Sequence, residues 1–147
     1  NEGALSIYPQ MAFFMPLIAA MGGNAGIQSS AIVVQGLASN TLINSTLIAK
    51  ILKELAVSLL NGLLCAGVLM GYTAFFHEGI QLAITVSSSL LVVIVLASLL
   101  GATIPLFLNR LNIDPALATG PFITTTNDLV GLGIYFLIGR LIYSIPM

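Results

Sequence analysis

One acidic residue stands deep inside an apolar stretch near the end of the chain. Asp128 lies in the predicted helix 121–143, whose only other charged residue is Arg140. A charge at the centre of a membrane helix costs at least about 2.5–3.5 kcal/mol, and such residues usually mark an ion pathway or a ligand site. An ion pair with Arg140 is disfavoured, because about 18 Å of helix separates the two residues. The position of Asp128 therefore predicts a functional site within the membrane.

Polar and small residues share the face of the helix that carries Asp128. Thr124 precedes Asp128 by one turn and Gly131 follows it by three residues. Residues three and four apart are neighbours on a helix surface. This face would therefore offer a carboxylate, a hydroxyl group and an accessible backbone carbonyl.

A second polar segment interrupts another uncharged span. Residues 16–28 combine a proline with closely spaced glycines and side-chain amides. A break of this kind is costly in hydrocarbon unless it is buried in protein or lines a watery cavity. We therefore predict that the helix is interrupted here, with carbonyl groups exposed at the glycines. The residues concerned are Pro16, Gly22, Gly23, Asn24, Gly26 and Gln28.

The two polar segments are expected to lie at similar depths in the membrane. At 1.5 Å per residue, Asp128 lies about 10 Å into its helix, counted from Pro121. Counted from Met11 on the opposite side, residues 22–28 lie about 17–26 Å into a core about 30 Å thick. Both positions fall in the same half of the membrane, so the two segments could face each other.

The groups in these segments are oxygen atoms and neutral amides, with neither His nor Cys among them. Hard cations prefer such ligands, whereas Zn²⁺ and Cu⁺ do not. Mg²⁺ dehydrates reluctantly and is suited to one or two carboxylates with retained waters. Rings of carbonyl groups also select K⁺ or Na⁺, so monovalent cations remain possible at this point.

The composition excludes a soluble protein. Of the 147 residues, 58% are hydrophobic and 6% are charged, whereas soluble domains are about 25% charged. We therefore predict an all-α integral membrane protein that lies in the lipid bilayer as one domain, 1–147. With four Lys and Arg residues in all, a nucleic-acid-binding face is not expected. The single cysteine, Cys65, excludes a disulfide framework.

Uncharged stretches long enough to cross a bilayer predict four membrane helices, since about 20 apolar residues are needed for each. They cover residues 11–38, 52–75, 82–108 and 121–143. Lys50, Lys53 and Arg110 fall at the same side, which the positive-inside rule places in the cytoplasm. Gly67 and Gly71 form a small-xxx-small pattern that predicts a close contact between helices.

Two motifs resemble the MgtE family of magnesium channels and transporters. Residues 14–29 read FMPLIAAMGGNAGIQS and are similar to the second membrane helix of that family. Residues 114–131 contain DPAL, GP and TTTNDLVG, which are similar to its last loop and fifth helix. The resemblance covers nearly the whole chain, and it implies the second to fifth helices of a five-helix membrane domain.

The resemblance also implies a function and a site. It implies a homodimer in a bacterial inner membrane, with a central pore for Mg²⁺ lined by the second and fifth helices of both subunits. Asp128 would hold a hydrated Mg²⁺, assisted by carbonyl groups around Gly23 and Thr124. The pore-lining residues implied are Gly22, Asn24, Gly26, Gln28, Asn127 and Gly131.

The chain also departs from the family pattern. The family's first helix and its cytoplasmic N-terminal and CBS domains have no counterpart in these 147 residues and are expected in the full-length protein. Residues 1–6 resemble the loop that follows the first helix. Gly120 stands where a polar side chain is expected. Glu54 and Asp114 are candidates for an accessory cytoplasmic metal site. For Glu54, a solvated charge stabilised by the N-terminal end of a helix is the simpler interpretation.

Two other classes of function compete with a magnesium channel. Coupled secondary transport of Mg²⁺ or another divalent cation with Na⁺ or H⁺ is the alternative, since transporters also build their sites at interrupted helices. An intramembrane enzyme is not expected, because the chain lacks the paired catalytic groups that such an enzyme needs.

Overall fold

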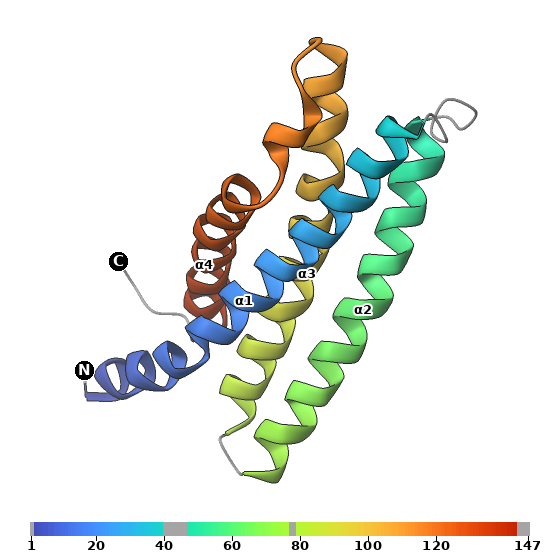
Figure 1. Ribbon diagram of the computed structural model, residues 1–147. Coiled ribbons are helices and arrows are strands. Elements are labelled where there is room, and N and C mark those ends of the chain that lie inside the picture. Colours follow the sequence, from blue (N-terminus) through green and yellow to red (C-terminus); the bar gives the residue numbers. More distant parts are fainter. Residues whose placement is uncertain (1, 40–46, 77–78, 144–147) are drawn as a thin grey trace.

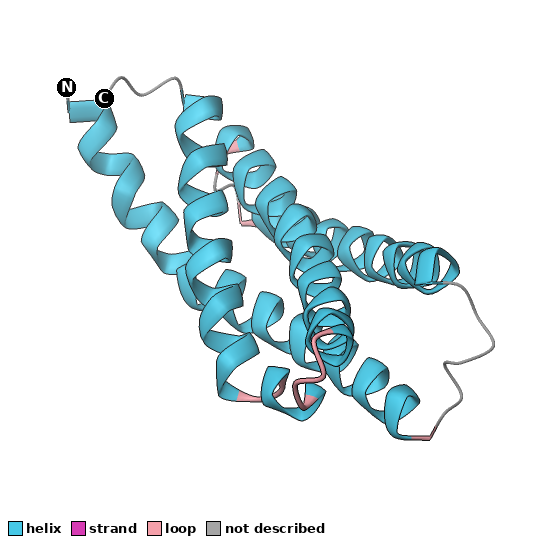
Figure 2. Cartoon of the chain, turned by 90° about the horizontal axis from the view of Figure 1, so that it is seen from above, coloured by secondary structure: helices cyan, strands magenta, loops and turns pink. Residues whose placement is uncertain are grey.

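The computed structural model describes residues 2–39, 47–76 and 79–143, and within these it contains helices and no strand. The long helices are α1 (Glu2–Ala38), α2 (Leu47–Phe75), α3 (Ile80–Arg110) and α4 (Pro121–Tyr143), with a short 3₁₀ helix, η1 (Pro115–Ala118), before α4. Figures 1 and 2 show the long helices side by side in one bundle. The four predicted helices and the all-α fold are therefore confirmed. The predicted connections at 40–46 and 77–78 lie outside the described residues.

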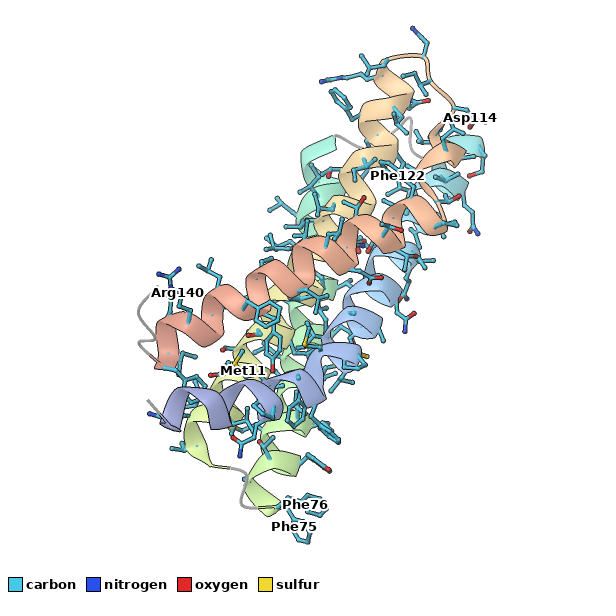
Figure 3. All side chains as sticks on the ribbon, turned by 90° about the vertical axis from the view of Figure 1, so that its left-hand side faces the viewer. Met11, Phe75, Phe76, Asp114, Phe122 and Arg140 are labelled. Carbon is cyan, nitrogen blue, oxygen red and sulfur yellow. The ribbon has the colours of Figure 1, made fainter. Side chains whose placement is uncertain are left out.

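Each of the four long helices is long and apolar enough to cross a membrane. The protein is therefore a multi-pass integral membrane protein. Lys50, Lys53 and Arg110 lie towards one end of the bundle, at the start of α2 and the end of α3. Figure 3 shows Asp114 at that end and Arg140 near the other.

Helix α1 differs from the prediction in two ways. It begins at Glu2, so the loop expected at residues 1–6 is wrong from Glu2 onwards. It also continues as an α-helix through residues 22–28, so the expected interruption is wrong. Glycine is tolerated inside membrane helices where neighbouring helices cover the backbone, and α3 and α4 both pack along α1.

The two prolines of α1 lie in its first half. Pro9 and Pro16 are both inside the helix, and Figure 1 shows its first turns at an angle to the remainder. Proline lacks the backbone N–H, so the carbonyl of Ala12 has no helical donor at position 16. Sharp bends in helices are almost always found at such positions. The effect of these prolines is thus a bend and not a break.

Helix α3 is the centre of the bundle, since α1, α2 and α4 all pack against it. Its buried face combines β-branched and other apolar side chains with the hydroxyl side chains of Thr85, Ser87, Ser89 and Ser98. The core residues include Phe14, Ile18, Leu90, Val93, Ile94 and Tyr135. On α2, Gly62 meets Leu91 of α3, whereas the predicted contact at Gly67 and Gly71 is not formed, because no other helix of the described chain faces them.

Two long-range hydrogen bonds fix α4 and its preceding loop to α1. The hydroxyl group of Tyr135 donates to the carbonyl of Met11, with an O···O distance of 2.9 Å. The hydroxyl group of Ser30 donates to the carbonyl of Ala118 in η1, at 2.7 Å, and this bond is buried. Figure 3 shows Met11 on the side of α1 that faces α4. The two bonds lie at opposite ends of the α1–α4 contact.

We expect Tyr135→Phe to lower the free energy of unfolding by about 1 kcal/mol, because one buried hydrogen bond is lost while the ring stays in place. Thermal unfolding of the purified protein in detergent would measure this as a fall of a few degrees in Tm. Tyr72→Phe is the matched control, since Tyr72 lies on the exposed surface of α2. Equal Tm values for the two variants would contradict this role of Tyr135.

The connection between α3 and α4 is built from local backbone geometry. Asn112 has a φ of 56° just after α3, and the N–H of Ile113 donates to the carbonyl of Leu108 at 3.0 Å, a common way to end a helix. Gly120 has a φ of 61° immediately before α4. Glycine adopts this left-handed conformation at no steric cost, which favours glycine over most polar side chains at position 120.

Candidate cation site

Helices α1 and α4 bring the two polar segments together. A Cβ atom placed on Gly23 would lie 3.4 Å from Thr124 Cγ2 and 3.6 Å from Asp128 Oδ1. The carboxylate of Asp128 therefore lies against the backbone of α1 at the point where α1 has no side chain. Asp128 is half-buried, so it is also accessible from outside this contact.

The orientation of Thr124 follows from its own helix. Its hydroxyl group donates to the carbonyl of Gly120 at 3.0 Å, and this turns the methyl group towards Gly23. Because α1 is helical here, the carbonyl of Gly23 already accepts one helical hydrogen bond and retains a second lone pair. The Gly23 carbonyl thus retains the capacity for one further hydrogen bond.

A close contact of three helices lies one turn further along α1. A Cβ atom on Gly26 would lie 1.8 Å from Asn127 Nδ2, and one on Gly101 of α3 would lie 2.2 Å from the Gly26 carbonyl oxygen. We call Gly26, Gly101 and Asn127 the glycine junction. It sets the spacing of α1, α3 and α4 beside Asp128. Gly101 was not predicted, although Ala97 and Gly101 form a small-xxx-small pattern that could have indicated it.

The side chain of Asn127 is 2% exposed, and neither its oxygen nor its nitrogen has a hydrogen-bond partner in the described part of the chain. A buried polar group without a partner costs about 1–3 kcal/mol. Such groups are rare in native proteins, and a polar residue kept in place at this cost often serves a function. Asn127 precedes Asp128 in the chain and faces α1 at Gly26.

We expect Asn127→Leu to raise the free energy of unfolding by about 1 kcal/mol, because a side chain of similar size replaces the buried amide. Transport should fall at the same time, as is usual where a polar residue is kept for function at a cost in stability. Thermal unfolding and ion flux would be measured on the same preparation. A less stable variant with unchanged flux would show that Asn127 has only a packing role.

Two predicted pore-lining glycines pack against α3. A Cβ atom on Gly22 would lie 2.7 Å from Val93 Cγ1, and one on Gly131 would lie 3.1 Å from the same atom. Both glycines are buried. Within one chain they allow α1 and α4 to approach Val93, and they do not face an open path.

The predicted pore-lining amides of α1, Asn24 and Gln28, are both exposed and lie one turn apart on the helix. Asn24 is exposed and adjacent in sequence to Gly23. Gln28 lines a hollow between α1 and α2, together with Glu54. Since Gly23 faces α4, the structure does not bring Gln28 to Asp128.

The two accessory candidates have other partners. Glu54 accepts a hydrogen bond from the hydroxyl group of Ser29, a buried residue that was not predicted. Because α2 begins at Leu47, Glu54 stands about two turns inside the helix and not at its N-terminal end. Asp114 accepts from the N–H of Ala116 at 2.9 Å and so caps η1. In the described residues, no group of three or more His, Cys, Asp or Glu side chains could hold a metal ion.

Comparison with known proteins gives one consistent result. A model of the MgtE family, described as a divalent cation transporter, matches residues 15–138. The chain is 36% identical over 135 residues to the magnesium transporter MgtE of Bacillus subtilis, covering 92% of this chain and 30% of that protein. It is 35% identical over 141 residues to the magnesium transporter MgtE of Thermus thermophilus, covering 96% and 31%. The chain thus spans about a third of the length of these relatives.

Proposed function

Because the chain belongs to the MgtE family of divalent cation transporters, we propose that it forms a path for Mg²⁺ in which Asp128 binds the hydrated ion. The observation that carries the proposal is the contact of Asp128 with Gly23, since it places the carboxylate against the α1 backbone inside the membrane-spanning part of the chain. Since its relatives are bacterial and its helices can span a membrane, the protein is assigned to the bacterial inner membrane.

The path is proposed to lie between two copies of the chain. The described membrane-spanning helices of one chain carry two acidic residues, Glu54 and Asp128, and Glu54 is hydrogen-bonded to Ser29 on the side facing α2. One carboxylate per chain is therefore left for the path, and this is few for a divalent ion. A symmetric dimer is the commonest oligomer and would place two Asp128 residues across one axis. Their mutual repulsion would be relieved by a divalent ion more fully than by a monovalent one. Charge selectivity would follow from this arrangement.

Recognition of a water shell fits the chemistry of the site. The carbonyls of α1 remain within an intact helix, so they can accept from water but are poorly placed to replace it. Mg²⁺ holds its waters strongly and is often bound through one or two carboxylates with waters retained. In this arrangement Asp128, Thr124 and Gly23 surround the ion, with Asn24 and Asn127 beside them. Selection by the size of the hydrated ion would follow.

The other predicted pore-lining residues are proposed to support the path from outside, by holding the helices in position. Gly22, Gly26 and Gly131 let α1 and α4 approach their neighbours closely. Gln28 lies on the surface of α1 that faces α2. We therefore propose that these residues hold the path in shape, and that the ion does not contact them.

Coupled secondary transport has less support than a passive path. It was suggested by an interrupted helix, and interrupted helices are how many coupled transporters build their sites. Helix α1 is continuous through residues 22–28. The feature that favoured coupling is therefore absent from this helix.

Flux measurements on the full protein in liposomes would test the proposal. We expect Mg²⁺ to enter down its own gradient at a rate that does not depend on an opposing Na⁺ or H⁺ gradient. Cross-linking between two copies carrying Ala20→Cys, a substitution on the exposed surface of α1 near Asn24, should yield a covalent dimer. Flux only in the presence of a second gradient would overturn the passive path, and a strictly monomeric active protein would overturn the shared site.

A further inference from the structure

A long groove separates α1 from α2 on the side of the bundle away from α4. Both helices pack along α3, whereas they scarcely touch each other. Figure 1 shows α1 crossing in front of α3, close to α2 at the top of the view and diverging from it towards the bottom. Two hollows of about 500 and 470 Å³ follow each other along this groove. Neither hollow includes Asp128, so the groove is distinct from the candidate cation site.

The first hollow is almost wholly apolar. Its walls come from the middle and outer turns of α1 and α2, with Leu90 of α3 at its base. The lining side chains include Phe13, Leu17, Met21, Leu64, Val68 and Tyr72. Several of these are strongly exposed, for example Val68 at 75%. Within a bilayer, this surface would be in contact with hydrocarbon.

The second hollow lies at the end that carries the basic residues, and charged and polar groups share its lining with apolar side chains. Lys50, Lys53 and Glu54 of α2 line it together with Gln28 of α1 and Asn61 of α2. Two lysines and one glutamate give this surface a net charge of +1. The carboxylate of Glu54 also accepts a hydrogen bond from Ser29 across the groove. The hollow therefore favours an anionic group that carries hydroxyl groups.

The near edge of the apolar hollow lies about one lipid leaflet from the lysines. Lys53 and Leu64 are eleven residues apart on α2, about 16 Å along the helix. Half of a hydrocarbon core about 30 Å thick is about 15 Å. A molecule with its charged group at Lys53 would therefore bring the end of its apolar tail to Leu64, at the near edge of the apolar hollow.

We propose that this groove binds one anionic phospholipid. Its phosphate lies at Lys50 and Lys53, its headgroup hydroxyls lie at Glu54 and Asn61, and an acyl chain lies in the apolar hollow. Basic pockets between membrane helices on the cytoplasmic side are typical binding sites for anionic headgroups. A bare or hydrated cation is disfavoured here, because it would meet one carboxylate flanked by two lysines.

Native mass spectrometry of the full protein, with phosphatidylglycerol or phosphatidylcholine added to the detergent, would test the proposal. The Lys50→Gln and Lys53→Gln double variant is expected to retain phosphatidylglycerol about 30-fold less well, as two contacts of about 1 kcal/mol each would be lost. Arg110→Gln is the matched control, because Arg110 is a basic residue at the same end of the bundle but does not line the groove. Retention of phosphatidylcholine should not change in either variant.

Three outcomes would overturn the proposal. The first is equal retention of phosphatidylglycerol by the double variant and by Arg110→Gln. The second is equal retention of phosphatidylglycerol by the Glu54→Gln variant and the unmodified protein, since the proposed contact of Glu54 with the headgroup hydroxyls would then be absent. The third is a disulfide formed through Cys65, which lines the apolar hollow, because a protein helix would then occupy the groove. Protection of Cys65 from a maleimide by phosphatidylglycerol, but not by phosphatidylcholine, would support lipid binding.

Discussion

Asp128→Asn is expected to abolish magnesium flux while leaving the fold intact. The substitution keeps the size of the side chain and removes its charge at the contact with Gly23. If each of two facing carboxylates contributes about 1.4 kcal/mol to ion binding, their joint loss reduces flux on the order of hundredfold. The free energy of unfolding should stay level or rise, because a charge in the membrane is costly. Flux into liposomes and thermal unfolding of the same variant would measure both effects.

Asp114→Asn is the control for Asp128→Asn. Asp114 is also acidic, but it caps η1 in the α3–α4 connection and lies outside the membrane-spanning helices. We expect it to lower the free energy of unfolding by about 1 kcal/mol or less, and to leave flux largely unchanged. Full flux in the Asp128→Asn variant would refute the proposed site, whatever the control shows.

Gly101→Ala is the packing change with the largest expected effect. The new methyl group would stand 2.2 Å from the carbonyl oxygen and 3.0 Å from the Cα atom of Gly26. Both atoms belong to the backbone, so α1 and α3 must separate to make room for it. Overpacking of this kind usually costs about 1–3 kcal/mol. Flux should also fall, because α1 carries Gly23 away from Asp128, and Tm and flux would be measured together.

Gly67→Ala is the matched control for Gly101→Ala. Gly67 also lies within a membrane helix, but a Cβ atom placed there would have no neighbour within 4 Å. Alanine is the better helix former by up to about 1 kcal/mol, so this variant should be as stable as the parent or more stable. If Gly101→Ala unfolds at the temperature of Gly67→Ala, the glycine junction does not set the helix spacing.

Helix placement was well predicted because apolar length and charge are properties of each segment alone. The predicted end at Ala38 and the predicted bounds of α4 agree with the structure. The predicted interruption of α1 was wrong because glycine content alone does not break a helix that has close neighbours. In this bundle the glycines of α1 are places where α3 and α4 come close, and those neighbours preserve the helix around them.

It was harder to predict which neighbouring helix each site residue faces than to predict where the helices lie in the sequence. Gly22 and Gly23 are adjacent in sequence, yet the first meets Val93 of α3 and the second meets Asp128 of α4. One residue turns the helix by about 100°, so a list of polar and small residues does not say which neighbour each one faces. The depth of Asp128 and Gly23 could be counted along each helix, whereas rotation about the helix axis depends on packing with the rest of the bundle.

The hydrogen bonds at Met11 and Ser30 have a consequence for movement. Tyr135 joins α4 to α1 at one end, and Ser30 joins the loop before α4 to α1 at the other. Between these two points lies the tight contact of Gly26 with Asn127. The pair α1–α4 is thus joined at both ends and in the middle. Any movement of α4 along α1 must break at least one of these three contacts.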